Sequence, residues 1–164
     1  MWRCSARLFP VDFTFTQRLP VAREPLFQFH EDPENLRVLL EGWEVTTVLT
    51  TDGHIRPGAR TGVLERMGPF RMRFVFEHFL LEPPERFGER QVRGIFRVFE
   101  HVHEFEECEA GATVIRDRLK VQLPVWLGGE AATRLVVAPR LVRFFSFRRR
   151  AYERLVAEGR IGVC

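Results

Sequence analysis

Three histidines and one aspartate are the side chains of this sequence best suited to binding or catalysis. His101 and His103 stand two residues apart in an alternating segment, so they share one face if that segment is a strand. Asp117 and His78 lie in two further alternating segments. A histidine beside a carboxylate can orient a polar ligand or move a proton, and two histidines with a third ligand can hold zinc. The choice among these depends on the elements that position the four side chains.

The segments that carry His101, His103 and Asp117 are predicted to pair as an antiparallel hairpin around a turn at residues 109–111. This pairing places His103 opposite Asp117 and His101 opposite Leu119. It also sets opposite charges across from each other on the second face, namely Glu104 with Arg116 and Glu100 with Lys120. A slip of one residue would turn the apolar set of one strand to solvent, so the register is well specified.

The same register directs both histidines and Asp117 toward the apolar side of the sheet, and alternation directs His78 there too. Ionisable groups in that position are costly unless they are paired or hydrogen-bonded. Four interpretations stay open: a satisfied internal network, a polar anchor in a ligand cavity, a metal site, and a His–Asp pair that transfers protons. The internal network and the polar anchor are favoured. The metal site is given less weight, because any alternating strand places histidines two residues apart on one face.

The remaining pattern predicts an α+β architecture. Alternation indicates a first strand at residues 11–19, and two short helices follow at residues 25–29 and from a cap at Asp32 to residues 41–42. Further strands are expected near residues 43–51, 59–67, 71–81, 91–106 and 113–123, and their short connections favour an antiparallel sheet. A long helix over residues 130–157, kinked or split at Pro139, is the only element long enough to cover that sheet.

Composition limits the class of protein. With 164 residues, 45% of them hydrophobic and 29% charged, the chain is one ordinary domain rather than a disordered or disulfide-dense protein. A net charge of +3 makes no nucleic-acid footprint unless it is clustered. Three scattered cysteines, with no signal-peptide pattern and no apolar run long enough for a membrane span, predict a cytoplasmic location. The 16 phenylalanines, against one tyrosine, suit a generous core or an apolar cavity.

Several segments resemble the START-like, or SRPBCC, superfamily, which includes Bet v 1-like and polyketide cyclase/dehydrase-like proteins. These are residues 27–36, residues 94–103, and a Gly111–Thr113–Asp117 set that looks like the Gly-Thr-x-x-x-Asp strand start of the family with Ala112 inserted. The chain is most similar to the bacterial ligand-binding branch. The resemblance implies a helix-grip fold, in which a curved antiparallel sheet wraps around a long C-terminal helix. It implies a domain at residues 11–158, between an N-terminal extension at residues 1–10 and a tail at residues 159–164.

The resemblance also implies an internal cavity between the sheet and the C-terminal helix. Relatives bind lipids, polyketides, sterols or other apolar molecules, and a minority catalyse cyclisation or dehydration. The residues expected to line or approach the cavity are Phe74, Phe76, His78, Phe99, His101, His103, Asp117 and Trp126. Trp126 belongs to an apolar loop at residues 124–127, which covers the cavity mouth, packs internally or, if exposed, contacts a membrane or a partner.

We therefore expect a non-enzymatic binder of an apolar or amphipathic small molecule, whose polar end is oriented by the His/Asp group. One alternative is a cyclase or dehydratase that uses a His–Asp pair, and another is an interaction module whose groove receives a protein segment. We expect no cofactor, no bound metal and no nucleic-acid partner, and we assign no catalytic residue. The arginines of the last helix, among them Arg148, Arg149 and Arg150, are expected to form a solvated face. A peripheral membrane contact through this helix or through the loop stays open, as does the oligomeric state.

Overall fold

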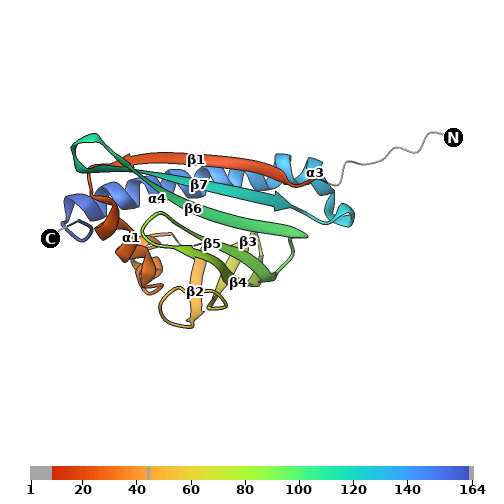
Figure 1. The fold of residues 1–164 in the computed structure, drawn as a ribbon. Helices are drawn as coiled ribbons and strands as arrows, with labels where there is room; N and C mark the ends of the chain where they lie inside the picture. The colour runs from red at the N-terminus through yellow and green to blue at the C-terminus, as the bar shows by residue number, and fades with distance from the viewer. Residues whose placement is uncertain (1–8, 44, 163–164) are drawn as a thin grey trace.

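The computed structural model describes residues 9–43 and 45–162, and its central feature is one seven-stranded antiparallel sheet (Figure 1). The strands are β1 (Val11–Leu19), β2 (Thr46–Thr51), β3 (Arg60–Met67), β4 (Phe70–Glu82), β5 (Arg86–Arg93), β6 (Val98–Cys108) and β7 (Ala112–Gln122). Their spatial order is β1-β7-β6-β5-β4-β3-β2. The first and second strands therefore form opposite edges of the sheet, and the chain crosses between them through two short helices.

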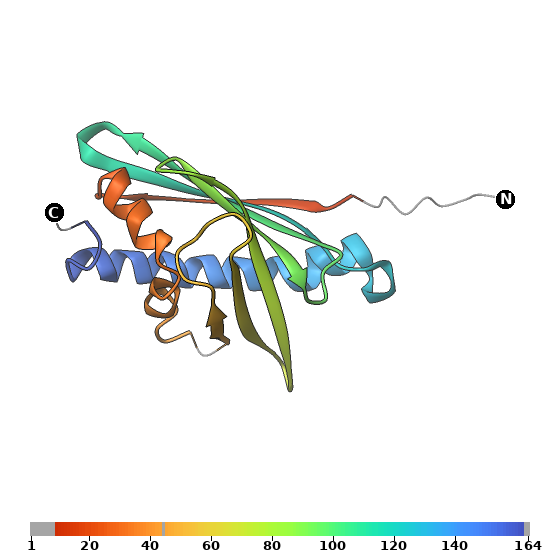
Figure 2. The ribbon, with the colours of Figure 1, turned by 60° about the horizontal axis from the view of Figure 1, so that its bottom comes forward.

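A long C-terminal helical segment covers one face of the sheet (Figure 2). It consists of α3 (Gly129–Ala132), a π-helical turn at Thr133–Val137, and α4 (Ala138–Ala157). The crossing helices α1 (Arg23–Glu31) and α2 (Asn35–Leu39) contact β6 and α4 respectively. Short 3-10 turns at Glu109–Gly111 and Val125–Leu127 complete the fold. The α+β helix-grip architecture expected from the sequence is confirmed.

The hydrophobic core lies between α4 and the curved sheet. Around the second half of α4, Leu155 packs with Phe27 of α1 and Ile115 of β7, all three of them buried. Around its first half, Phe145 packs with Leu119 and Val121 of β7. These contacts fix α4 against β7, and they hold the side chains of β6 and β7 that point toward the helix in set positions.

The hairpin of β6 and β7 has the predicted register. His103 pairs with Asp117, His101 with Leu119, Glu104 with Arg116 and Glu100 with Lys120. An ion pair of 3.6 Å joins Arg116 Nη1 to Glu104 Oε2 on the outer face. Alternation of apolar and charged residues, together with the opposite charges paired on the outer face, specifies this hairpin, since a slip of one residue would bury the outer charges of one strand.

One predicted strand proved to be parts of two. The sequence predicted a single strand over residues 91–106, whereas β5 ends at Arg93 and β6 begins at Val98. Gly94 lies between them with φ of +155°, a conformation that other residues rarely adopt. The reversal at Gly94 makes β5 a separate strand that begins at Arg86, and the sheet gains a strand that the sequence pattern did not indicate.

The helical segment is interrupted near Pro139, as predicted. The π-helical turn at Thr133–Val137 directly precedes α4, and Pro139 occupies the first turn of that helix. Proline has no backbone N–H to donate, and the start of a helix is where this loss costs least. Thr133 links the start of the helical segment to the residue after β7, because its hydroxyl donates to the Gly129 carbonyl and accepts from the Leu123 N–H.

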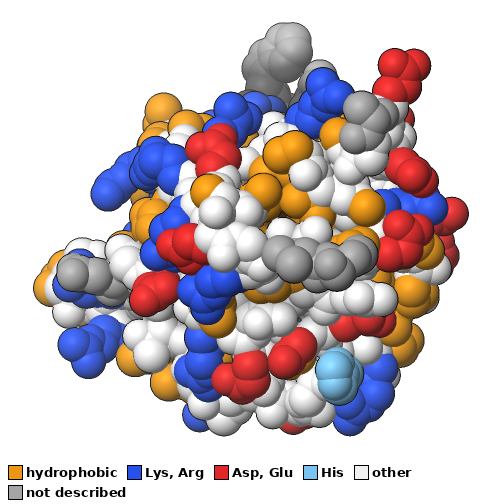
Figure 3. Space-filling model, turned by 90° about the vertical axis from the view of Figure 1, so that its left-hand side faces the viewer, with side chains coloured by type: hydrophobic (Ala, Val, Ile, Leu, Met, Phe, Trp, Pro, Cys, Tyr) orange, Lys and Arg blue, Asp and Glu red, His pale blue; other side chains and the backbone are white. Residues whose placement is uncertain are grey.

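Of the predicted extension at residues 1–10 and the tail at residues 159–164, residues 1–8 and 163–164 lie outside the described part. None of the described helices has the length and apolarity needed to cross a membrane. Acidic and basic side chains are interspersed over the face drawn in Figure 3, with hydrophobic side chains between them.

Candidate functional site

Five ionisable side chains meet between the sheet and α4, and we call them the polar cluster. They are Glu89 of β5, His101 and His103 of β6, Asp117 of β7 and Arg148 of α4. The two histidines are each 5% exposed, Asp117 is 6% exposed and Arg148 is 4% exposed. Charged groups at such depth must compensate one another, because an unpaired buried charge is strongly destabilising.

Asp117 contacts both histidines through one oxygen. Its Oδ1 lies 2.9 Å from Nε2 of His101, at hydrogen-bonding geometry, and 2.7 Å from Nδ1 of His103. The second contact is close but poorly directed for a hydrogen bond. The same carboxylate therefore contacts both rings, that of His101 through Nε2 and that of His103 through Nδ1.

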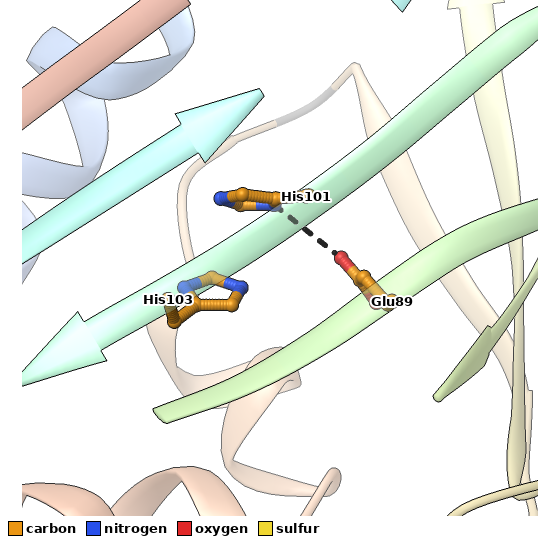
Figure 4. A group of neighbouring side chains, drawn as sticks. All are labelled: Glu89, His101 and His103. Carbon is orange, nitrogen blue, oxygen red and sulfur yellow. Dashed lines mark ion pairs between the residues drawn. The ribbon is translucent and has the colours of Figure 1, made fainter. Parts of the chain in front are cut away.

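Glu89 reaches the same two rings from the neighbouring strand. Residues 89 and 101 are directly opposite in the pairing of β5 with β6, and Glu89 Oε1 lies 3.5 Å from His101 Nδ1. Donor atoms of Glu89, His101 and His103 all lie within 4.8 Å of one another. Figure 4 shows the carboxylate of Glu89 facing both rings.

Arg148 connects the cluster to a second chain of hydrogen bonds. Its Nη1 lies 3.3 Å from Asp117 Oδ1, and its Nη2 donates to the Tyr152 hydroxyl at 2.6 Å. The ring of His30 lies next, with Nε2 at 2.6 Å from that hydroxyl and Nδ1 at 2.7 Å from the Leu26 carbonyl. Since a carbonyl only accepts, Nδ1 of His30 donates to it, and a neutral His30 then accepts the Tyr152 proton at Nε2.

Electrostatics within the polar cluster favour a balanced set of charges. Burial opposes ionisation of both carboxyls, but Arg148 and the histidines outweigh it for Asp117 and hold its pKa well below the usual range. Burial opposes ionisation of Glu89, but the nearby His101 outweighs it and lowers the pKa of Glu89 to about 2. Burial disfavours a charged His101, yet Asp117 and Glu89 raise its pKa.

The second histidine of the cluster and the residues near Arg148 stay neutral. Burial, followed by the charge of His101, lowers the pKa of His103 to about 3. Burial likewise lowers the pKa of His30 to about 4 and raises the pKa of Tyr152 to about 12. Asp117 is thus paired with Arg148, Glu89 lies beside His101, and His103 remains a neutral imidazole.

A cavity of about 120 Å³ opens above the polar cluster. Its polar wall includes Glu89, His101, His103, Arg148 and also His78 of β4, whose buried Nδ1 has no hydrogen-bond partner. Its apolar wall includes Phe87 of β5 and Phe144 of α4. Most of the partly exposed lining residues lie within residues 29–36, so the cavity opens beside the α1–α2 connection.

A larger, half-open groove of about 410 Å³ lies on the other side of Arg148, between β1 and α4. Phe15 of β1 and Phe145 of α4 stack in it with ring centroids 4.0 Å apart, and Arg149 and Arg150 line it further along α4. Asp117 lines this groove and not the cavity, whereas Arg148 lines both. The Asp117–Arg148 pair therefore separates the two spaces.

The residues nominated from sequence fall into three places. His78, His101 and His103 line the cavity, with Asp117 directly behind the two histidines of β6. The three nominated phenylalanines lie outside the cavity lining. They are Phe74, Phe76 and Phe99, and they form an aromatic cluster with Phe96. Trp126 is 80% exposed and lines neither space.

Glu89, Arg148, Tyr152 and His30 were missed by the sequence reasoning. Arg148 was interpreted as part of a solvated arginine-rich face, and its 4% exposure shows that interpretation to be wrong for this residue. A signal was present, because Arg148 follows Phe145 by three residues and precedes Tyr152 by four, which places it on the apolar face of α4. Glu89 lay in a segment to which no strand had been assigned.

Comparison with known proteins gives one family. The sequence profile described as "Polyketide cyclase / dehydrase and lipid transport" matches residues 19–145. That match runs from the end of β1 into α4 and includes every member of the polar cluster except Arg148. No curated protein matches the chain.

Solved structures share the fold at low sequence identity. A protein from Thermus thermophilus has a TM-score of 0.69 at 16% identity, with 90% of this chain and 99% of that chain covered. A protein from Mycobacterium smegmatis has a TM-score of 0.68 at 18% identity, covering 92% and 93%. Norcoclaurine synthase from Thalictrum flavum has a TM-score of 0.64 at 14% identity, covering 96% and 94%. At these identities the likeness establishes the fold alone.

Proposed function

The chain belongs to the polyketide cyclase / dehydrase and lipid transport family, and on that basis we propose that it binds an apolar or amphipathic small molecule in its internal cavity. The observation that carries this proposal is the composition of the cavity wall. Phe87 and Phe144 provide aromatic surface, while His78 presents a buried nitrogen that has no partner. Ligand sites are mostly apolar, with a few placed polar groups that fix orientation.

The size of the cavity limits which part of the ligand it encloses. Its volume of about 120 Å³ is below the roughly 300–1,000 Å³ of sites for drug-sized molecules. It is close to the roughly 150 Å³ of an engineered cavity that admits benzene. The cavity therefore encloses one ring or a short polar end, and any longer apolar part extends through the opening beside residues 29–36.

The charges beside the cavity favour a neutral polar end. Within the polar cluster Asp117 is already paired with Arg148 and Glu89 lies beside His101, so a charged end of an organic ligand would find no free partner there. His78 can pair with a single hydroxyl or carbonyl oxygen, since one ring nitrogen is a donor in either tautomer and the other an acceptor. An alcohol, ketone or phenol with an apolar body meets both requirements.

A cyclase or dehydratase would need a proton donor or acceptor that faces the ligand near neutral pH. His103 is a weak base with a pKa of about 3, and Glu89 is held ionised with a pKa of about 2. Neither value lies near neutrality, where general acid–base catalysis is most efficient. These values make His103 and Glu89 poor proton-transfer groups, which favours binding, and a His101→Ala or His103→Ala variant that keeps affinity but loses turnover would reverse that preference.

An exposed apolar surface supports transfer of the ligand from a lipid surface. The 3-10 turn before α3 and the π-helical turn after it present the apolar tip, consisting of Val125, Trp126, Leu127, Leu135 and Val136. Exposed arginines at positions 134 and 143 accompany it. Tryptophan and aliphatic groups next to arginines suit the boundary of an anionic bilayer. We therefore propose that the apolar tip contacts the surface of an anionic bilayer.

Binding is tested by comparing two probes of similar size. Benzyl alcohol and toluene both match the volume of the cavity, and only the alcohol can pair with His78. We expect titration calorimetry to show tighter binding of benzyl alcohol, and a His78→Phe variant to lose this preference. His54→Phe, which changes an exposed histidine of the β2–β3 loop, is the matched control. Absence of binding by both probes, together with a bare mass in native mass spectrometry, would exclude the proposed function.

A further inference from the structure

Three donor atoms that could hold a metal ion converge at the polar wall of the cavity. Glu89, His101 and His103 each offer one donor, all within 4.8 Å of one another (Figure 4). Glu89 Oε1 and His101 Nδ1 are 3.5 Å apart, longer than the roughly 2.7–2.9 Å of a charge-assisted hydrogen bond. In a tetrahedral zinc site with bonds of about 2.0–2.2 Å, ligand atoms stand about 3.4 Å apart. The observed distance therefore fits two ligands of one ion.

Asp117 supplies the outer contacts that orient metal-binding histidines. It lies 2.9 Å from Nε2 of His101 and 2.7 Å from Nδ1 of His103, which leaves the opposite nitrogen of each ring on the side of Glu89. A carboxylate behind a ligating histidine fixes the orientation of the ring and increases its basicity. Here one carboxylate serves both rings, and Arg148 in turn holds that carboxylate in place.

The backbone also fixes the geometry of the three donors. Glu89 is paired directly with His101 across β5 and β6, and His103 follows on the same face of β6. Sites built on paired strands hold their ligands more precisely than sites on loops. The sequence alone gave a metal site little weight, because any alternating strand places two histidines on one face, and β5 adds a third ligand.

We propose that Glu89, His101 and His103 bind a divalent transition-metal ion, for which Zn²⁺ is the probe of choice. Two histidines and one carboxylate form a donor set that suits zinc and iron(II). All three residues line the cavity, so the remaining coordination position faces the space in which a ligand oxygen would lie. This site is independent of the proposed function, because the metal can bind whether or not an organic ligand does.

The first test is metal binding by the full chain after treatment with a chelator. We expect calorimetry and elemental analysis to show one tightly bound Zn²⁺ per chain. His103→Ala and Glu89→Gln should each weaken that binding by more than about 10-fold, because each removes an atom bound to the ion, and even the loss of a residue that only orients a ligand costs about 10–100-fold. Glu89→Gln keeps the shape of a partly exposed side chain, so it remains informative if the histidine variant does not fold.

Other zinc-binding side chains provide the controls. His54→Ala and Cys108→Ser remove an exposed histidine and a free cysteine that lie outside the proposed site, and both should leave the affinity unchanged. X-ray absorption of the loaded protein should show two imidazoles and only nitrogen or oxygen ligands. Sulfur ligation, equal loss of affinity in a control variant, or the absence of stoichiometric binding would overturn the proposal.

Discussion

Arg148 of α4 and Asp117 of β7 form a buried ion pair, with 3.3 Å between Nη1 and Oδ1, that joins the C-terminal helix to the sheet. The pair separates the internal cavity from the groove beside β1. It also keeps Asp117 ionised, which in turn lets that carboxylate hold His101 and His103. The positions of both histidines thus depend on a side chain from the opposite layer of the fold.

Removing Arg148 alone should therefore destabilise the protein strongly. Arg148→Met leaves Asp117 buried without its main cationic partner, and breaking a buried pair in this way costs about 3–5 kcal/mol. The double variant Asp117→Asn/Arg148→Met should lose less than Arg148→Met does, because no uncompensated charge remains. Urea unfolding measures both free energies, and Arg150→Met on the exposed face of α4 serves as the control. A double variant less stable than Arg148→Met would contradict this account.

Neutral His30 should make stability depend on pH in a defined window. Its pKa falls from 6.5 to about 4 because of burial, so the unfolded chain binds more protons between these values. The contribution of His30 to the free energy of unfolding should accordingly be complete above pH 6.5 and should be lost as the pH falls toward about 4. Urea unfolding at several pH values measures the slope. His30→Gln should reduce the slope, and the exposed His54→Gln should leave it unchanged.

Gly94 should resist substitution more than a glycine in an open turn. Its φ of +155° is strained for other residues, and an added Cβ would collide with side-chain atoms of Gln91 and Phe74. We expect Gly94→Ala to cost about 2–4 kcal/mol, combining strain with overpacking. Gly53→Ala provides the comparison, because Gly53 has φ of +82° with nothing near its Cβ position. Equal losses in thermal or urea unfolding would show that packing around Gly94 contributes nothing.

The sequence pattern predicted the part of the site that lies on β6 and β7, where apolar and polar residues alternate regularly. The β6–β7 register followed from alternation and from opposite charges on the outer face, so the positions of His101, His103 and Asp117 were predictable. The position of Glu89 was not predictable, because the inner face of β5 carries Glu89 and Gln91 beside Phe87 and is therefore only partly apolar. A strand that places polar groups in a site loses the periodicity by which strands are recognised.

Arg148 illustrates a second reason why part of the site could not be predicted from the sequence. It stands in a run of three arginines, and only tertiary structure shows that this one turns inward while its neighbours at positions 149 and 150 stay exposed. Its burial depends on Asp117, which lies 31 residues away in the sequence. Pairing between distant charges leaves no periodic signal, so composition alone favoured the solvated interpretation.

The apolar tip leads to the last prediction, on binding to lipid surfaces. Trp126 is 80% exposed and contributes to neither cavity nor groove, so Trp126→Ala should leave the folded structure and the binding of benzyl alcohol unchanged. It should instead reduce co-sedimentation with vesicles of anionic phospholipid several-fold, because a large interfacial side chain is lost. Phe70 is 71% exposed near the β3–β4 turn, outside the apolar tip, and Phe70→Ala is the matched control. Binding that depends equally on Phe70, or that is absent in the unaltered protein, would remove the membrane from the proposed function and leave the cavity proposal to its own test.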